Sequence, residues 1–181
     1  MDRTRCKTRR TVALGWLAAT LTAQAVFAAE RTATLTLDFR SPPAAGQPAA
    51  LALELSAGVP LHGVRLDLLS RGAIRLLDDP EPLPPALDAG ASHRQMIGVW
   101  IGDRGRAEVT AVLSGTDAYD LPVTRTVTLY VIVDEAGVGV GTDGFALLER
   151  RRLDLLQGRG LVKPADYDRR LRRLLVAAPA Y

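Results

Sequence analysis

The sequence predicts a mainly β protein: an antiparallel β-sandwich of about seven short strands, followed by a C-terminal hairpin of two helices. Three observations favour this fold class. Apolar and polar residues alternate in short segments that glycine and proline separate, which is typical of strands and turns. No helical periodicity occurs before residue 140. After residue 145, leucines recur at the spacing of an amphipathic helix.

The first 28 residues have the layout of a secretory signal peptide. A basic start is followed by a largely apolar stretch and by small residues before the expected cleavage site after Ala28. We therefore expect export to the periplasm of a bacterium, most simply by the general secretory (Sec) route, although the Arg9-Arg10 pair partly resembles a twin-arginine signal. The alternative is an uncleaved leader anchored in the inner membrane, but polar residues shorten its apolar run below the roughly 20 residues of a spanning helix.

Charge is distributed unevenly along the chain. The net charge of +3 includes a basic leader, so the basic excess gives no support to nucleic-acid binding by the exported part. Residues 30–135 have 9 basic and 14 acidic residues, a net charge of −5, whereas residues 136–181 have 9 basic and 5 acidic residues, a net charge of +4. This difference predicts attraction between body and tail, within one chain or between copies; independently solvated charges are the alternative. Cys6 lies in the leader, so the exported part has no thiol.

The strands are expected where apolar residues occupy every second position. Such a segment buries one face of a sheet and leaves the other face polar. The turn Gly102–Gly105 is expected to join two of the strands as a hairpin. The expected strands are residues 32–39, 49–57, 64–68, 73–77, 97–101, 107–113 and 121–133.

The last of these segments, residues 121–133, is the clearest strand. Leucine or valine occupies most odd positions, and threonines and Tyr130 occupy even ones. Arg125 breaks the pattern because it falls at an inward position. A buried, unpaired arginine is costly, so we expect either a β-bulge at Thr124–Arg125 or a first half that frays at a sheet edge.

The proline-rich, acidic segment 78–91 is expected to form a loop, because proline cannot donate to a sheet ladder. It ends in Leu87-Asp88-Ala89-Gly90-Ala91-Ser92 before the next strand. This step and the spacing of the strands over residues 32–134 resemble bacterial extracytoplasmic Ig-like modules of the CARDB type. The resemblance implies an Ig-like β-sandwich over residues 30–135 that binds or spaces rather than catalyses.

A glycine-rich segment, residues 136–144, predicts a flexible linker after the sandwich. Thr142 or Asp143 is placed to cap a first helix over residues 145–157. Gly158-Arg159-Gly160 is expected to end that helix, as glycines do at helix C-termini. The segment 145–176 is therefore predicted to form a helical hairpin.

The second helix of this hairpin is expected to begin at Pro164 and to carry many arginines. The run Gly160–Tyr167, followed by Arg170 and by Leu174-Leu175, resembles the SHOCT motif, a short C-terminal helical hairpin, over about residues 150–175. Lys163 departs from the threonine usual in that motif. The resemblance implies an element for interaction or oligomerisation. The residues expected to take part are Leu153, Leu156, Tyr167, Leu171, Leu174 and Leu175.

The chain lacks a recognisable catalytic or metal-binding set. His62 and His93 have no metal-ligand or general-base spacing around them. Asp78, Asp79 and Glu81, with acidic residues at 117 and 120, form an alternative calcium site, but a solvated loop explains them more simply. The glycines of residues 137–141 lack the Lys-Ser/Thr of a phosphate loop. We expect a protein that is not an enzyme and uses no cofactor.

These observations predict an exported interaction module of the bacterial envelope that binds a protein partner or a second copy of itself. The alternative is a carbohydrate- or envelope-surface-binding module, with Trp100 and Tyr119 as stacking side chains. Trp100 shares one strand face with Met96, either over an open edge of the core or as an exposed patch. The arginine-rich final helix is a further candidate for contact with anionic lipid. Nucleic acid is not an expected partner.

Overall fold

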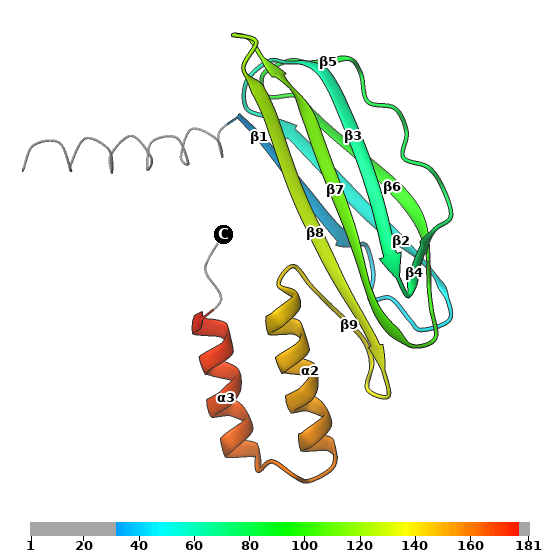
Figure 1. Cartoon of the computed structure of the whole chain (residues 1–181), viewed down its shortest axis with the longest axis vertical. Helices are drawn as coiled ribbons and strands as arrows, with labels where there is room; N and C mark the ends of the chain where they lie inside the picture. Colours follow the sequence, from blue (N-terminus) through cyan, green and yellow to red (C-terminus); the bar gives the residue numbers. More distant parts are fainter. Residues whose placement is uncertain (1–31, 178–181) are drawn as a thin grey trace, which may run out of the picture.

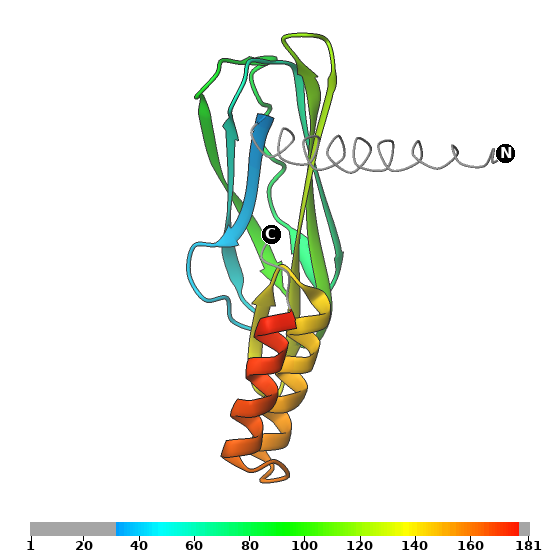
Figure 2. The same cartoon turned by 90° about the vertical axis from the view of Figure 1, so that its left-hand side faces the viewer.

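The computed structural model describes residues 32–177, which form nine strands and two helices. The strands pack as two sheets, and the helices lie side by side at one end of the sandwich (Figures 1 and 2). The signal peptide expected over residues 1–28 lies outside the described residues. The elements are β1 (Ala33–Phe39), β2 (Pro48–Ala57), β3 (Leu61–Gly72), β4 (Ile74–Leu76), β5 (Ala86–Leu87), β6 (Ser92–Ile101), β7 (Gly105–Asp117), β8 (Pro122–Asp134), β9 (Gly137–Gly141), α2 (Gly144–Gly158) and α3 (Pro164–Ala177).

The two sheets have the strand order of an immunoglobulin sandwich. One sheet is ordered β1-β2-β6-β4 and the other β5-β3-β7-β8-β9, with antiparallel pairing throughout. If the main strands β1, β2, β3, β4, β6, β7 and β8 are lettered A to G, the sheets read A-B-E-D and C-F-G, the arrangement of a constant-type immunoglobulin domain. The predicted fold class, an Ig-like sandwich followed by a two-helix hairpin, is confirmed. The sequence did not predict β5 and β9, which lie at the two edges of the second sheet.

The core lies between the sheets and consists of alternate residues from the facing strands. In β6, Ile97, Val99 and Ile101 are buried, while Met96 and Trp100, at alternate positions, face outward. The buried residues form a larger cluster that includes Val99 and Val131, and a smaller one around other strand residues such as Leu55. Each fully buried leucine or valine stabilises the fold by about 1.5–3 kcal/mol relative to its exposed state.

The turn Gly102–Gly105 connects the two sheets and does not form the hairpin that the sequence predicted. β6 pairs with β2 and β4 in one sheet, whereas β7 pairs with β3 and β8 in the other. Alternation identifies strands but does not say which strands pair. The segments before and after this turn have similar apolar patterns whether they pair with each other or belong to different sheets.

Arg125 departs from both sequence-based expectations. β8 pairs with β7 without a register shift from Pro122 to Val133, so β8 has neither a bulge nor a frayed half. The Arg125 side chain instead reaches the first strand of the other sheet, where its Nε donates a hydrogen bond of 2.9 Å to the carbonyl of Ala33. This bond joins β8 to β1 across the open side of the sandwich and gives the inward-facing guanidinium a backbone partner.

The prediction of a flexible linker over residues 136–144 is wrong for its central part. Gly137–Gly141 forms β9, which pairs with β8 along the edge of the second sheet. Glycine and valine alternate in this strand. Val138 and Val140 pack against the core, whereas a Cβ at Gly139 would lie 2.9 Å from the Cδ of Arg151 in α2. The glycines therefore allow α2 to approach the strand closely, so their role is close packing rather than flexibility.

The two helices begin and end near the positions that the sequence indicated. Asp143 caps α2, with its Oδ1 accepting hydrogen bonds from the backbone N–H groups of Phe145 (2.9 Å) and Ala146 (3.0 Å). At the other end, Gly160 has a φ of 68°, and Leu161 N–H donates to the Leu156 carbonyl (2.9 Å) as in a Schellman motif. No helix within residues 32–177 is long and apolar enough to cross a membrane.

Candidate functional site

Helix α2 is fixed to the sandwich by a partly buried ion pair. Arg151 donates from Nε to Asp134 Oδ2 (3.1 Å) and from Nη2 to Asp134 Oδ1 (2.5 Å). The same Nη2 also donates to the carbonyl of Gly137 (2.6 Å). The side chains of Arg151 and Asp134 are only 12% and 19% exposed. A two-pronged arginine–carboxylate contact of this kind fixes orientation as well as distance, so α2 has a defined position on β8 and β9.

A second, exposed contact lies near the C-terminal end of α2. Glu135 accepts from Arg104 Nη2 (3.2 Å) and from Arg159 Nη2 (3.4 Å), and all three side chains are more than half exposed. Such exposed pairs contribute little, typically below about 1 kcal/mol. The charge difference between body and tail is thus used within one chain, mainly through Arg151 and Asp134.

Helix α3 packs on α2 at the side away from the sandwich (Figures 1 and 2). Of the predicted interaction residues, Leu153 is buried, and Leu156, Tyr167 and Leu171 are half-buried. The side chains of Leu174 and Leu175 lie outside the described residues. The structure therefore places the described members of the predicted set on the two neighbouring helices, and much of their apolar surface is already covered within the hairpin.

A polar contact joins the two helices. The Tyr167 hydroxyl donates a hydrogen bond of 2.5 Å to Asp154 Oδ1. This hydrogen bond to Asp154 raises the pKa of Tyr167 above its ordinary value, and burial of the phenol acts in the same direction. Deprotonation would remove the donor and place a second negative charge beside the carboxylate, so the contact favours neutral Tyr167.

The outer side of α3 is strongly cationic. Arg169 pairs with Asp166 at 3.6 Å. Arg170, Arg172 and Arg173 are exposed, and none of them forms an ion pair with another described side chain. This surface can receive a carboxylate or phosphate without first breaking an internal pair.

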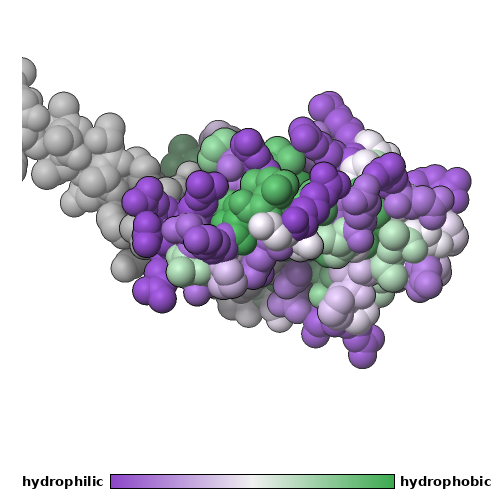
Figure 3. All heavy atoms as spheres, turned by 90° about the horizontal axis from the view of Figure 1, so that it is seen from below, coloured by the Kyte–Doolittle hydropathy of each residue, from purple (hydrophilic) through white to green (hydrophobic). Residues whose placement is uncertain are grey.

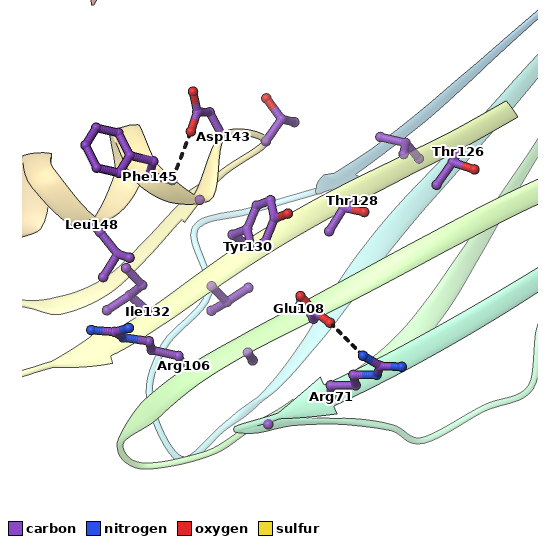
Figure 4. A pocket seen from close by; sticks show the side chains of 16 residues that line it. Arg71, Arg106, Glu108, Thr126, Thr128, Tyr130, Ile132, Asp143, Phe145 and Leu148 are labelled. Carbon is purple, nitrogen blue, oxygen red and sulfur yellow. Dashed lines mark hydrogen bonds and ion pairs between the residues drawn. The ribbon is translucent and has the colours of Figure 1, made fainter. Parts of the chain in front are cut away.

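A cavity of about 1160 Å³ lies between the outer face of the second sheet and the start of α2. Figure 4 shows side chains of β8 in a row along its floor, with α2 side chains at one end and charged side chains of β7 and β3 beside them. Phe145 is 70% exposed. Arg71 Nη1 lies 3.6 Å from Glu108 Oε1, and the Arg71 side chain of this ion pair is exposed to solvent. The labelled lining residues are Arg71, Arg106, Glu108, Thr126, Thr128, Tyr130, Ile132, Asp143, Phe145 and Leu148.

A second cavity, of about 610 Å³, continues along α2 toward its C-terminal end. Both cavities are lined by Arg106, Ile132 and Leu148, so they form one elongated depression, called the α2 groove below. Figure 3 shows the helical end from below, where apolar atoms gather within a hydrophilic border. The second cavity adds Leu155 and Leu156 to the apolar lining. The elongated shape leaves room for an extended chain along α2.

Sequence reasoning did not predict the α2 groove. The row of threonines and Tyr130 on the outward face of β8 was visible in the sequence, but the opposite wall comes from α2. The position of α2 as a wall of the groove depends on its packing against β9, and the sequence predicted a flexible linker for the residues of β9. The signal that was available is the strict Gly-Val alternation of residues 137–141.

The aromatic side chains proposed for carbohydrate stacking are not brought together. Trp100 is 38% exposed and lies with Met96 (42% exposed) on the outer face of the first sheet, so these two form an exposed patch rather than a cover for the core. Tyr119 is 84% exposed in the turn between β7 and β8. Because β6 and β7 both run the length of the sandwich, Trp100 and Tyr119 lie at opposite ends of it.

The histidines and the acidic loop residues are also dispersed. Neither His62 nor His93 lines the α2 groove, and residues 32–177 contain no group of three or more His, Cys, Asp or Glu able to hold a metal ion. Asp78 Oδ2 accepts from Gly98 N–H (3.1 Å), whereas Asp117 Oδ1 accepts from the N–H groups of the β7–β8 turn. These carboxylates shape separate loops and do not form the alternative calcium site.

Comparison with known proteins gives a distant similarity to a solved structure. No family model matches the chain, and no curated protein matches it. Among solved structures, the chain is similar to a crystal structure of native alpha-2-macroglobulin from Escherichia coli that spans domain MG7 to the C-terminus, with a TM-score of 0.45 and 19% sequence identity. The match covers 54% of this chain and 16% of that chain.

Proposed function

We propose that this protein is an exported, non-enzymatic interaction module of the bacterial envelope. It binds a protein partner or a second copy of itself, and the α2–α3 hairpin presents the binding surface. The observation that carries this proposal is the asymmetry of the hairpin. Arg151 holds α2 on the sandwich, while α3 packs on α2 and leaves Arg170, Arg172 and Arg173 exposed.

The arrangement supports binding because one helix, α2, attaches the hairpin to the sandwich, while the other, α3, presents its exposed side chains to a partner. The SHOCT-like run of residues 160–175 falls on the α2–α3 connection and on α3, the part of the hairpin furthest from the sandwich (Figure 1). A helix that its neighbour already orders loses little conformational entropy when a partner binds. Periplasmic location remains part of the proposal and follows from the leader.

A truncation after Gly160 tests this proposal, because it removes α3 and leaves β9 and α2 in place. The experiment compares the proteins that co-purify with the full chain and with the truncated chain, together with the solution mass of each. We expect loss of a specific partner or of self-association. Identical partners and identical mass for both chains would contradict the proposal.

A charge-reversal variant separates the cationic surface from the presence of the helix. Substituting Arg170, Arg172 and Arg173 by glutamate should weaken capture of the same partner while the circular dichroism of the protein stays unchanged. The matched control reverses three exposed, unpaired arginines of the body, Arg40, Arg65 and Arg75, and should leave capture intact. Anionic lipid is tested alongside with vesicles of phosphatidylglycerol.

A second candidate function, binding of an envelope glycan, is favoured by the exposed Trp100 and Met96 on the outer face of the first sheet. Small residues surround them on β2, where Ala52 pairs with Met96 and Pro48 with Trp100. A flat indole suits stacking against a sugar ring, and Arg75 lies opposite Trp100 on the neighbouring strand β4. Co-sedimentation with purified peptidoglycan that Trp100→Ala leaves unchanged would exclude this face as a glycan site.

A further inference from the structure

The residues that line the α2 groove carry an excess of positive charge. Asp134 is engaged by Arg151, and Asp143 caps α2. Arg106 is exposed at the centre of the groove and pairs with no other described side chain. The other arginines of the groove each pair with a carboxylate, with Glu135 pairing with both Arg104 and Arg159, so Arg106 is the arginine left to receive an anion. It lies on a body, residues 30–135, with a net charge of −5. The charged lining of the groove comprises six arginines (Arg71, Arg104, Arg106, Arg151, Arg152, Arg159) and four carboxylates (Glu108, Asp134, Asp143, Glu149).

The groove also offers an aromatic and aliphatic floor. Tyr130 and Phe145 lie near one another at one end, and Ile132 and Leu148 lie at the centre (Figure 4). Aromatic-lined grooves bind extended, proline-rich segments, because such segments are already ordered before they dock. Arginines beside the aromatic rings add a preference for acidic residues. The occupant that this chemistry fits is an acidic, proline-rich segment in extended conformation.

The chain itself contains a segment of this kind. Residues 78–85, DDPEPLPP, combine three acidic residues with four prolines and no basic residue. They form neither helix nor strand and connect β4 to β5. Hydrogen bonds hold the segment at three points: Gly98 N–H donates to Asp78 Oδ2 (3.1 Å), Glu81 N–H to the Oε1 of buried Gln95 (2.7 Å), and Val64 N–H to the Pro85 carbonyl (3.2 Å). Leu83 packs against the smaller core cluster, whereas the acidic side chains of the segment face outward. The carboxylates of Asp79 and Glu81 are exposed and pair with no described cation.

Within one copy the acidic segment and the groove lie apart. The segment borders β5, whereas α2 lies against β9, and β5 and β9 are the opposite edges of the same sheet. Figure 1 shows the segment on the side of the sandwich away from the helices. The segment can therefore fill the groove of another copy but not its own.

We propose that residues 78–85 of one copy dock in the α2 groove of a second copy, with Asp79 and Glu81 facing Arg106 and its neighbours. This inference rests on the self-association in the proposed function and locates it in the α2 groove, whose lining contains no residue of α3. Truncation after Gly160 leaves the groove in place, so it tests partner binding by α3 separately from this contact. The two contacting surfaces differ, so the contact is heterologous and continues from copy to copy instead of closing as a two-fold dimer. Association is expected to weaken with salt because exposed charges contribute to it.

Sedimentation velocity of the protein purified from expression of the full chain tests the proposal. The sedimentation coefficient should rise with protein concentration and fall toward the monomer value as sodium chloride is raised. Arg106→Glu alone and Glu81→Arg alone should each weaken association roughly tenfold, because each places like charges opposite one another. A mixture of the two variants should associate again, since each variant then meets a complementary surface. A mixture that associates no better than either variant alone would overturn the proposal.

Two further measurements keep the outcomes distinct. A synthetic peptide of residues 78–86 should bind the protein, and a peptide with Asn and Gln in place of its acids should bind at least about tenfold more weakly. The control Arg75→Glu changes an exposed arginine outside the groove and should leave association unchanged. If Arg106→Glu prevents capture of another protein while the peptide does not bind, the groove takes a different occupant and this inference fails. Loss of partner capture on truncation after Gly160 would still support the proposed function in that case.

Discussion

Helices α2 and α3 are adjacent and similar in length, yet they are attached in different ways. α2 contacts β8 and β9, buries Leu147 and Leu153, and contributes Arg151 to a partly buried ion pair. α3 packs on α2 and adds one hydrogen bond, from Tyr167 to Asp154. α2 is thus part of the sandwich's structure, whereas α3 is an addition to α2.

This difference shows how the molecule combines a firm base with an accessible element. The contacts of α2 are bidentate, apolar and largely shielded from water, so they resist salt and hold one geometry. Those of α3 are made with α2 and include the partly buried bond between Tyr167 and Asp154, so α3 depends on α2 for its position. Single substitutions and a change of pH can remove or measure this difference in attachment, and the loss of stability that we expect decreases from the first of them to the last.

Removing the ion pair should make α2 as weakly held as α3. We expect Arg151→Ala to lower the free energy of opening of α2 by about 3 kcal/mol, because Asp134 loses its partner in a partly buried site. Amide hydrogen exchange of α2 and β9 measures this change. Arg152→Ala is the control, because the Arg152 side chain is 72% exposed and its Nη1 lies 3.9 Å from Glu149 Oε1, so this ion pair lies at the surface. Equal effects of the two variants would show that the ion pair does not hold the helix.

Adding one methyl group to β9 should push α2 away from the sheet. A Cβ at Gly139 would lie 2.9 Å from Arg151 Cδ and 3.3 Å from Leu147 Cδ1. Because Asp134 holds Arg151, the neighbour cannot move freely, and we expect Gly139→Ala to destabilise the protein by about 1–2 kcal/mol in chemical denaturation. Gly158→Ala should instead stabilise it by up to about 1 kcal/mol, since nothing lies within 4 Å of its Cβ position. Destabilisation by both variants would refute the steric explanation.

The hydrogen bond between the helices should matter for α3 alone. Tyr167→Phe keeps the ring and removes the hydroxyl that donates to Asp154. We expect hydrogen-exchange protection of α3 to fall by about 1 kcal/mol, with protection of α2 and of the sandwich unchanged. A uniform loss of protection across the protein would mean that the helices unfold together.

Alkaline pH should loosen α3 selectively. Hydrogen bonding to Asp154 raises the pKa of Tyr167 above the ordinary value of 10.0. A raised pKa means that this contribution to stability is fully present below about pH 10 and is lost as the pH rises through the pKa of the folded state. The fluorescence of a probe attached to α3, which reports the packing of α3 on α2, should therefore change above about pH 10. The same titration of Tyr167→Phe should show no such step.

The sequence predicted the sandwich well because strand alternation is a local property. The segments from residues 32 to 133 each bury one face, and that requirement appears in the order of their residues. β9 was missed because its outward residues are glycines, whose meaning depends on the helix that packs against them. The expectation for Arg125 failed for a related reason, since its partner, the Ala33 carbonyl, belongs to a strand at the other end of the sequence.

The candidate site could be predicted only in part. Helix limits, the cap at Asp143 and the placement of Leu153 and Tyr167 in the hairpin follow from local signals. The α2 groove does not, because its walls come from β3, β7, β8 and α2 and meet only through tertiary packing. Trp100 could be assigned to the outward face from alternation, but its distance from Tyr119 depends on which strands pair.

The hydrogen bond between Arg125 and Ala33 also sets an order of events during folding. The two residues are 92 positions apart, whereas α2 and β9 follow β8 directly in the chain. Local contacts form faster than distant ones, so β9 and α2 are able to assemble on β8 early. β1 is synthesised first among the strands but has to wait for β8 before its connection across the sandwich forms. Until then β2 is its partner strand, and its free edge is open to incorrect pairing in a partly folded chain.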